Sequence, residues 1–191
     1  ALFIHIDSYM NVVLLKHGDK YSADDVNKQA QSIIKVSKGI MGQIYCFTED
    51  RTGVDIECLD IPEKPKLRRW WNKMHLFRDN FPLTGKCVLF DLDVEIKTDP
   101  FEYIKDIDFS TPTFMRDDWK KDLHYKKHSY ETELNSSVLA WTAHKNTYIW
   151  DLFSKNIDYN TRKYKGIDRF FWNEIKDWNT FDSGIHKSVI V

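Results

Sequence analysis

A short apolar run that ends in two carboxylates constrains this sequence more than any other feature. The run, residues 87–90, is followed by Asp91 and Asp93, and Gly85 stands just before it. An apolar run of this length with a turn residue in front of it predicts a strand buried on both faces. Such strands lie in the middle of α/β sheets, where ligand sites form at the carboxyl ends. Asp91 and Asp93 are therefore predicted at the point where a buried strand opens into a site.

The spacing of the two aspartates indicates a cation site. Alternation along a strand places the side chains of Asp91 and Asp93 on the same side. Two like charges there repel each other unless a cation joins them, and hard oxygen ligands suit Mg²⁺ or Mn²⁺, which keep positions open for phosphate oxygens. The alternative interpretation is a solvated carboxylate pair at a strand end, but the apolar run before the pair favours the metal site.

Composition limits the class of protein. The 191 residues suffice for one domain with a sizeable core, and we expect a single domain over residues 1–191. The net charge of −1 creates no global field that would attract nucleic acid. No apolar run approaches the roughly 20 residues that span a bilayer, and residues 1–7 are too short and polar for a secretory signal.

Cysteine and aromatic content add two expectations. The three cysteines are odd in number, and Cys46 and Cys87 lie in apolar runs, which suits free buried thiols and predicts a reducing, cytoplasmic setting. The seven Trp, nine Tyr and twelve Phe are mostly expected in the core, with some available to stack on sugar rings.

Periodicity elsewhere predicts an α/β fold with a mainly parallel sheet flanked by helices. Ser22 and Asp25 form a capping-box pattern at the start of a helix that ends near Gly39. Strands are predicted at 11–16, 43–47, 54–59, 109–115 and 137–141, and helices at 69–79, 100 onward, 147–153 and 167–175. Residues 116–133 are heavily charged without a clear period, and we expect a flap that orders when ligands bind.

Six segments follow one another in an order that resembles a known superfamily. They are Lys-His-Gly-Asp-Lys-Tyr at 16–21, Cys-Phe-Thr-Glu-Asp at 46–50, Trp-Trp-Asn-Lys at 70–73, Phe-Asp-Leu-Asp at 90–93, Asn-Ser-Ser-Val at 135–138 and Gly-Ile-Asp at 166–168. Together they resemble the GT-A glycosyltransferases, especially the short stand-alone proteins of this type in phages and bacteria. The resemblance implies a single GT-A-like (Rossmann-like) domain.

The resemblance also implies a nucleotide site at the first two loops. Its matching positions are Lys16, Gly18, Tyr21, Thr48 and Asp50. The alternative for residues 48–50 is a plain polar turn.

A basic residue on the helix before the Asp-x-Asp motif is implied to act on the donor. Lys73 matches it and would face the diphosphate or the donor sugar as a point charge. The alternative is a solvated helix lysine. Trp70 and Trp71 are predicted to be core residues rather than stacking residues.

The metal ligands implied by the resemblance are Asp93, which binds the cation directly, and Asp91, which contacts the ribose or a metal-bound water. A C-terminal histidine often completes the shell, and His186 is the candidate here. The tail around it does not reproduce the usual pattern, so Asp182 remains a rival ligand.

Two further segments are implied to flank the donor sugar. Asn135 and Ser136 match one of them, and Asp168 matches the acidic residue that starts a late helix and points at the reaction centre. A purely structural reason for Asp168 is the helix dipole, which favours a carboxylate in the first turn.

The function implied is metal-dependent transfer of a sugar from a nucleoside-diphosphate sugar, UDP-sugar being favoured, to a hydroxyl acceptor with Mn²⁺ or Mg²⁺. One alternative is a haloacid-dehalogenase-type phosphatase, whose Asp-x-Asp strand normally opens the domain. The other is a non-catalytic module that binds sugars or sugar nucleotides. Diphosphate release, phosphate release, or binding without turnover would distinguish the three.

Overall fold

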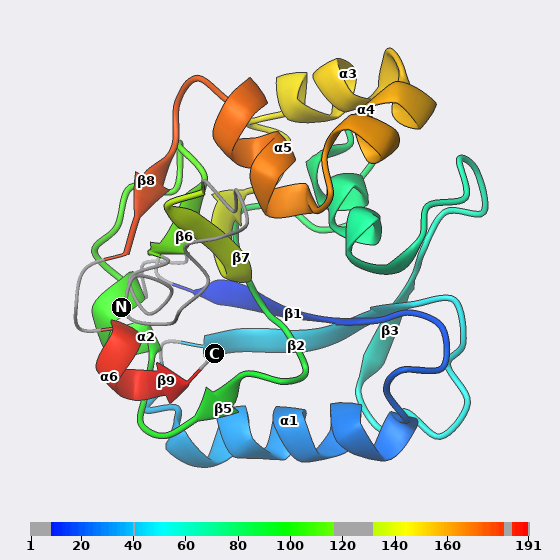
Figure 1. Cartoon of the computed structure of the whole chain (residues 1–191). Helices are drawn as coiled ribbons and strands as arrows, with labels where there is room; N and C mark the ends of the chain where they lie inside the picture. Colours follow the sequence, from blue (N-terminus) through cyan, green and yellow to red (C-terminus); the bar gives the residue numbers. More distant parts are fainter. Residues whose placement is uncertain (1–8, 40, 117–131, 182–184, 191) are drawn as a thin grey trace, which may run out of the picture.

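The chain folds around a seven-stranded sheet (Figure 1). The computed structural model describes residues 9–39, 41–116, 132–181 and 185–190. In spatial order the strands are β3 (Glu57–Asp60), β2 (Met41–Thr48), β1 (Met10–Lys16), β4 (Lys86–Phe90), β7 (Leu134–Thr142), β6 (Thr113–Arg116) and β8 (Asn179–Thr180). The pairs β3·β2, β2·β1, β1·β4 and β6·β8 are parallel, whereas β7 runs antiparallel to both of its neighbours, β4 and β6. The predicted α/β class and mainly parallel sheet are confirmed.

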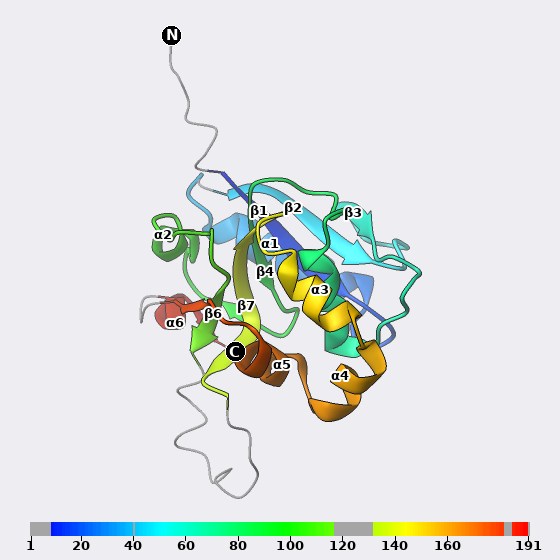
Figure 2. The ribbon, with the colours of Figure 1, turned by 90° about the horizontal axis from the view of Figure 1, so that it is seen from above.

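Helices cover both faces of this sheet (Figures 1 and 2). Helix α1 (Ala23–Val36) lies along one face. The opposite face carries the 3₁₀ helix η2 (Arg69–Phe77), α3 (Tyr148–Ser154), α4 (Ile157–Lys163) and α5 (Ile167–Glu174). Two short helices, α2 (Phe101–Ile104) and α6 (Ile185–Ser188), and a small sheet of β5 (Glu95–Ile96) and β9 (Val189–Ile190) complete the described part. None of the described helices is both long and apolar enough to span a membrane.

Strand β4 is buried on both faces, as its sequence predicts. Cys87 and Leu89 belong to the core beneath η2, α3 and α5, whereas Val88 and Phe90 belong to the core beneath α1 and α2. All four side chains are fully buried. The period-2 alternation of a strand therefore divides one apolar run between two cores.

Strand order creates the crevice that holds the site. The chain moves outward from β1 through β2 to β3 and then returns to place β4 on the other side of β1. The two connections leave β1 and β4 in opposite directions, which opens a crevice beyond the carboxyl ends of these two strands. The segments after Lys16 and after Phe90 both enter this crevice.

The capping box predicted at the start of α1 is confirmed. The hydroxyl of Ser22 accepts the backbone N–H of Asp25, and the Asp25 carboxylate accepts the backbone N–H of Ser22. Both bonds of the capping box are therefore present.

Three local features of the structure differ from the sequence prediction. The helix predicted at 69–79 is a 3₁₀ helix buried on all sides from Trp71 to Phe77, because it lies between the sheet and α3, so no single apolar stripe applies. Trp70 at its start is 43% exposed rather than core. Helix α4 has no counterpart in the prediction because its side chains are mostly polar and only Asn160 is buried.

Two features predicted from the sequence lie partly or wholly outside the described residues. The charged flap is described only at its ends, Arg116, Thr132 and Glu133, and Asp182 is not described.

Candidate active site

The Asp-x-Asp motif forms a turn at the carboxyl end of β4. Strand β4 ends at Phe90, and the backbone N–H of Val94 donates to the Asp91 carbonyl over 3.1 Å. The Asp91 N–H donates to the Ser137 carbonyl at 2.8 Å, which ties the turn to β7. The prediction that strand alternation orients the two carboxylates is therefore wrong, because the motif is no longer strand. Both side chains nevertheless reach the same cavity.

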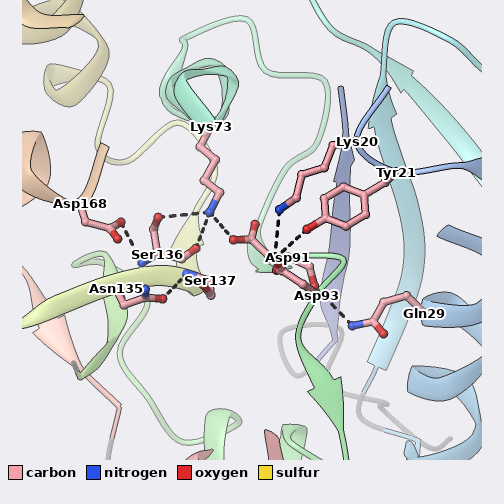
Figure 3. A network of polar contacts seen from close by, with 10 residues as sticks. All are labelled: Lys20, Tyr21, Gln29, Lys73, Asp91, Asp93, Asn135, Ser136, Ser137 and Asp168. Atoms are coloured by element: carbon pink, nitrogen blue, oxygen red, sulfur yellow. Dashed lines mark hydrogen bonds and ion pairs between the residues drawn. The ribbon is translucent and has the colours of Figure 1, made fainter. Parts of the chain in front are cut away.

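Helix α1 supports this turn through one buried amide. Gln29 Nε2 donates to the Val94 carbonyl at 2.7 Å. It also lies 3.5 Å from the Asp91 carbonyl (Figure 3). Sequence reasoning missed Gln29, although its position between Val26 and Ala30 on the apolar face of α1 was a visible signal.

A cavity of about 470 Å³ lies beside the motif. Half of its ten lining residues are charged: the two aspartates, two lysines and one arginine. The lining consists of Leu15, His17, Lys20, Tyr21, Arg69, Trp70, Lys73, Asp91, Leu92 and Asp93. The cavity therefore joins the β1 loop, the start of η2 and the Asp-x-Asp turn, which are the three segments that β1–β4 strand order brings together.

Lys73 is the central buried cation. It is 4% exposed, and its Nζ lies 2.8 Å from Asp91 Oδ2, 2.9 Å from the Ser136 carbonyl and 3.2 Å from Ser136 Oγ (Figure 3). Three acceptors satisfy the three donors of an ammonium group. The alternative of a solvated helix lysine is wrong, since the all-round burial of η2 draws Lys73 into the interior.

The two aspartates differ in their electrostatic surroundings. Burial raises the pKa of the Asp91 carboxyl above its ordinary value, and the nearby Lys73 ammonium counteracts this only in part. Burial also acts to raise the pKa of Asp93, but hydrogen bonds from Tyr21 and Lys20 outweigh it, so that this pKa is lowered. Asp93 is therefore the more readily ionised of the pair.

Asp93 has two partners from the loop after β1. The Tyr21 hydroxyl donates to Asp93 Oδ2 at 2.7 Å, and Lys20 Nζ lies 3.2 Å from the same oxygen. The resemblance pointed to Tyr21 as a nucleotide contact, whereas Lys20 was not singled out. Its charge was visible in the sequence, but its partner lies 73 residues away.

Asp168 joins the same network through β7. It lies in the first turn of α5, as predicted, and its Oδ1 accepts the backbone N–H of Ser136 at 3.0 Å. Ser136 thereby connects Asp168 to Lys73 and, through Lys73, to Asp91 (Figure 3). Asn135 Oδ1 accepts the Ser137 N–H at 2.8 Å. The structure thus places Asp168, Ser136, Lys73 and Asp91 in one continuous chain of contacts.

A second cavity, about 390 Å³, lies beside the loops after β1 and β2. Four predicted nucleotide positions line it, namely Lys16, Gly18, Tyr21 and Asp50. Lys16 Nζ lies 3.8 Å from Asp50 Oδ2. Thr48 is fully buried and its hydroxyl accepts the Asp50 N–H at 3.1 Å, so it orders the loop rather than lining the cavity. Tyr21 lines both cavities.

Glu49 is a member of this second site that sequence reasoning missed. Its Oε1 accepts the Gly18 N–H at 2.6 Å, and its Oε2 lies 3.1 Å from His17 Nδ1. Although burial acts in the opposite direction, these contacts lower the pKa of Glu49. The loop after β1 therefore already holds a carboxylate through a backbone N–H and an imidazole.

The donor set of the motif fits a divalent cation. Asp91 and Asp93 supply hard oxygen atoms at one cavity wall, and Mg²⁺ or Mn²⁺ is commonly bound through one or two carboxylates together with substrate phosphates. Within the described residues no group of three or more His, Cys, Asp or Glu side chains gathers around a common point. The side chain of His186 lies outside the described part, so its predicted role stays a prediction.

Comparison with known proteins places the fold. Neither a scan against protein-family models nor a search of curated proteins gives a match. Among solved structures, the chain is similar to the galactosyltransferase LgtC in complex with donor and acceptor sugar analogues, with a TM-score of 0.64 and 15% identity over 91% of this chain and 74% of that one.

A second similar structure is the glycosyltransferase GlyE of Streptococcus pneumoniae TIGR4. Its TM-score is 0.61 at 11% identity, and the match covers 91% of this chain and 46% of GlyE. An active-site variant of LgtC matches with a TM-score of 0.62. The chain therefore has the fold of the GT-A glycosyltransferases.

Proposed function

We propose that this protein transfers a sugar from a nucleoside-diphosphate sugar, most simply a UDP-sugar, to a hydroxyl acceptor, with Mn²⁺ or Mg²⁺ as cofactor. The single observation that carries the proposal is the cavity at the carboxyl ends of β1 and β4. There, Asp91 and Asp93 line the same cavity as Lys20, Arg69 and Lys73 within a GT-A fold. A diphosphate leaving group develops negative charge, which cationic side chains and a carboxylate-bound metal ion can stabilise.

Each charged residue has a role that follows from its contacts. Asp93 and Asp91 would hold the divalent cation, which when bound stabilises negative charge on the diphosphate as a Lewis acid. Lys73 keeps the Asp91 carboxylate and the β7 segment around Ser136 at fixed positions. Preorganised charge of this kind needs no rearrangement when charge develops during the reaction.

The nucleotide and the sugar would occupy different parts of the site. Lys16, Gly18, Tyr21 and Asp50 border the second cavity, which suits the nucleotide portion. Asn135, Ser136 and Asp168 lie on the other side of Lys73 and would face the donor sugar (Figure 3). We assign Asp168 to orientation of the donor sugar and stabilisation of positive charge on it, because its carboxylate is held by a backbone N–H.

Neither alternative function gains support from the geometry. The phosphatase motif belongs on the strand that opens the domain, whereas β1, β2 and β3 all precede β4 in the described part of this chain. A non-catalytic binding module shares every contact described above, and only turnover separates it from an enzyme.

The test is a panel of nucleotide sugars assayed for diphosphate release with Mn²⁺ and with EDTA. Asp93→Asn should lower release by about 100-fold or more, because it removes a charge on which the cation depends. The exposed Asp106→Asn is the matched control and should be unaffected. Thermal unfolding should show both variants folded, since an amide oxygen at position 93 still accepts from Tyr21.

Two results would contradict the proposal. Undiminished activity in EDTA would remove the metal from the mechanism. Tight binding of a nucleotide sugar without diphosphate release, across a panel of hydroxyl acceptors, would identify a binding module instead.

A further inference from the structure

The two lysines that contact the motif differ in how freely their side chains can move. The side chain of Lys73 is 5% exposed and has three acceptors, so it cannot move without loss of buried contacts. The side chain of Lys20 is 71% exposed and meets the carboxylate of Asp93, itself 57% exposed. Lys20 sits on a long flexible stem and its ammonium is a point charge without fixed geometry. Of the two lysines, Lys20 is therefore the one that is able to exchange partners.

The charge balance of the cavity opposes a divalent cation in the free protein. Its wall carries three cations, Lys20, Arg69 and Lys73, against the carboxylates of Asp91 and Asp93. These five side chains together carry one net positive charge. In addition, the Asp93 oxygen that accepts from Lys20 also accepts from Tyr21. A metal ion that approaches Asp93 thus meets an occupied oxygen and a like charge.

We propose that Lys20 is an exchangeable counter-ion for Asp93. In the free protein Lys20 neutralises Asp93, and when a nucleoside diphosphate enters, the Lys20 ammonium moves to a phosphate oxygen and leaves Asp93 to the divalent cation. This inference rests on the proposed function, because it needs a diphosphate in the same cavity. Lys20 is then a positioning residue that affects the order in which the diphosphate and the divalent cation bind. It takes no part in the chemical step.

The exchange couples the two ligands. Since the diphosphate removes the competitor of the metal ion, each ligand raises the affinity for the other by the same factor. Loss of Lys20 should therefore have opposite effects on the two ligands: the metal ion alone binds more tightly, whereas the diphosphate in the presence of metal binds more weakly. A lysine that only contributed to folding would not give opposite signs.

The experiment is calorimetric titration of the full chain with Mn²⁺ alone, with UDP alone and with UDP at saturating Mn²⁺. Lys20→Met should tighten Mn²⁺ binding to the free protein by about two- to five-fold, the range expected for an exposed ion pair. It should weaken UDP binding in saturating Mn²⁺ by at least a similar factor. Lys35→Met, which removes an exposed lysine from the last turn of α1 far from the motif in sequence, is the matched control and should change neither constant.

The outcomes separate the inference from the function on which it rests. Equal Mn²⁺ affinity of wild type, Lys20→Met and Lys35→Met would overturn the counter-ion role of Lys20, even if UDP binds and a UDP-sugar is turned over. Weaker Mn²⁺ binding by Lys20→Met would also overturn it. Failure of wild type to bind UDP at any Mn²⁺ concentration would overturn the proposed function and the exchange, while the Mn²⁺ titration alone would still decide whether Lys20 competes for Asp93.

Discussion

At the scale of the residue, burial decides what each charged side chain can do. Lys73 and Lys20 both contact the motif, yet one lies in the interior and the other reaches out from the surface. Loss of one partner from a buried pair leaves an uncompensated charge, whereas an exposed pair contributes little to stability. Lys73 is therefore a structural cation of the site, and Lys20 is an adjustable one.

A buried histidine gives the first prediction at this scale. His75 on η2 is 1% exposed, stacks on Trp150 and has no hydrogen-bond partner for either ring nitrogen among the described residues. Burial, with a smaller effect of Arg78, lowers its pKa from 6.5 to about 4. Between pH 6.5 and pH 4 the His75 imidazole is therefore protonated in the unfolded chain but neutral in the folded protein. Protonation then favours the unfolded chain, so the free energy of unfolding is highest above pH 6.5 and falls as the pH is lowered toward 4.

Urea unfolding followed by tryptophan fluorescence measures the effect. His75 should lower the free energy of unfolding by about 2 kcal/mol between pH 7 and pH 5. The pH dependence of His75→Phe should be smaller than that of wild type by this amount. Parallel curves for the two proteins would show that His75 is protonated in the folded state as readily as in the unfolded chain.

At the scale of the element, short segments position the site more than long helices do. The 3₁₀ helix η2 carries Lys73 inward, the turn after β4 carries both aspartates, and β7 supplies Ser136 between Lys73 and Asp168. Because β7 runs antiparallel to β4, it brings the segment around Ser136 beside the end of β4. Helix α5 contributes through its first turn alone.

The element-scale prediction concerns that turn. Asp168→Asn keeps an oxygen that can accept the Ser136 N–H but removes the charge. Sugar transfer should fall by about 100-fold or more, the order seen when one electrostatic or acid–base group is lost. UDP affinity, measured by calorimetry, should change little, because the second cavity lies on the other side of Lys73. Near-normal transfer would reduce Asp168 to a residue that stabilises the helix terminus.

At the scale of the whole molecule, strand order determines where chemistry can take place. The reversal of direction between β1 and β4 forms the crevice that holds the first cavity, and the second cavity lies next to it, beside the loops after β1 and β2. The two cores on either side of the sheet hold β1 and β4 rigidly, since their side chains are divided between both. A rigid sheet and loops at its edge are a common arrangement for ligand sites in α/β proteins.

This arrangement predicts how the fold responds to metal removal. The carboxylates of the site have cationic partners within the protein, so EDTA should abolish sugar transfer and leave the thermal midpoint within about 2 °C. Mn²⁺ and UDP together, each at about 100 times Kd, should raise the midpoint by roughly 10–20 °C. Differential scanning calorimetry measures both shifts. A large fall of the midpoint in EDTA alone would mean that the cation is part of the fold.

The sequence by itself determined those features that depend on neighbours along the chain. The apolar run at 87–90 specified a strand buried on both faces, because alternation sends successive side chains to opposite sides. Ser22 and Asp25 specified the start of α1, because both capping bonds lie within one helical turn. The pattern after Gly166 placed Asp168 in the first turn of a helix.

Only the tertiary structure decided which charge meets which. Asp91 binds a lysine 18 residues before it, Asp93 binds a lysine 73 residues before it, and Lys73 reaches a serine 63 residues after it. The conversion of the motif from strand to turn and the burial of η2 on all sides likewise follow from strand order and from packing against α3. Local periodicity reports whether a residue is buried, but the partner of a buried charge depends on which distant segments the sheet brings to the same edge.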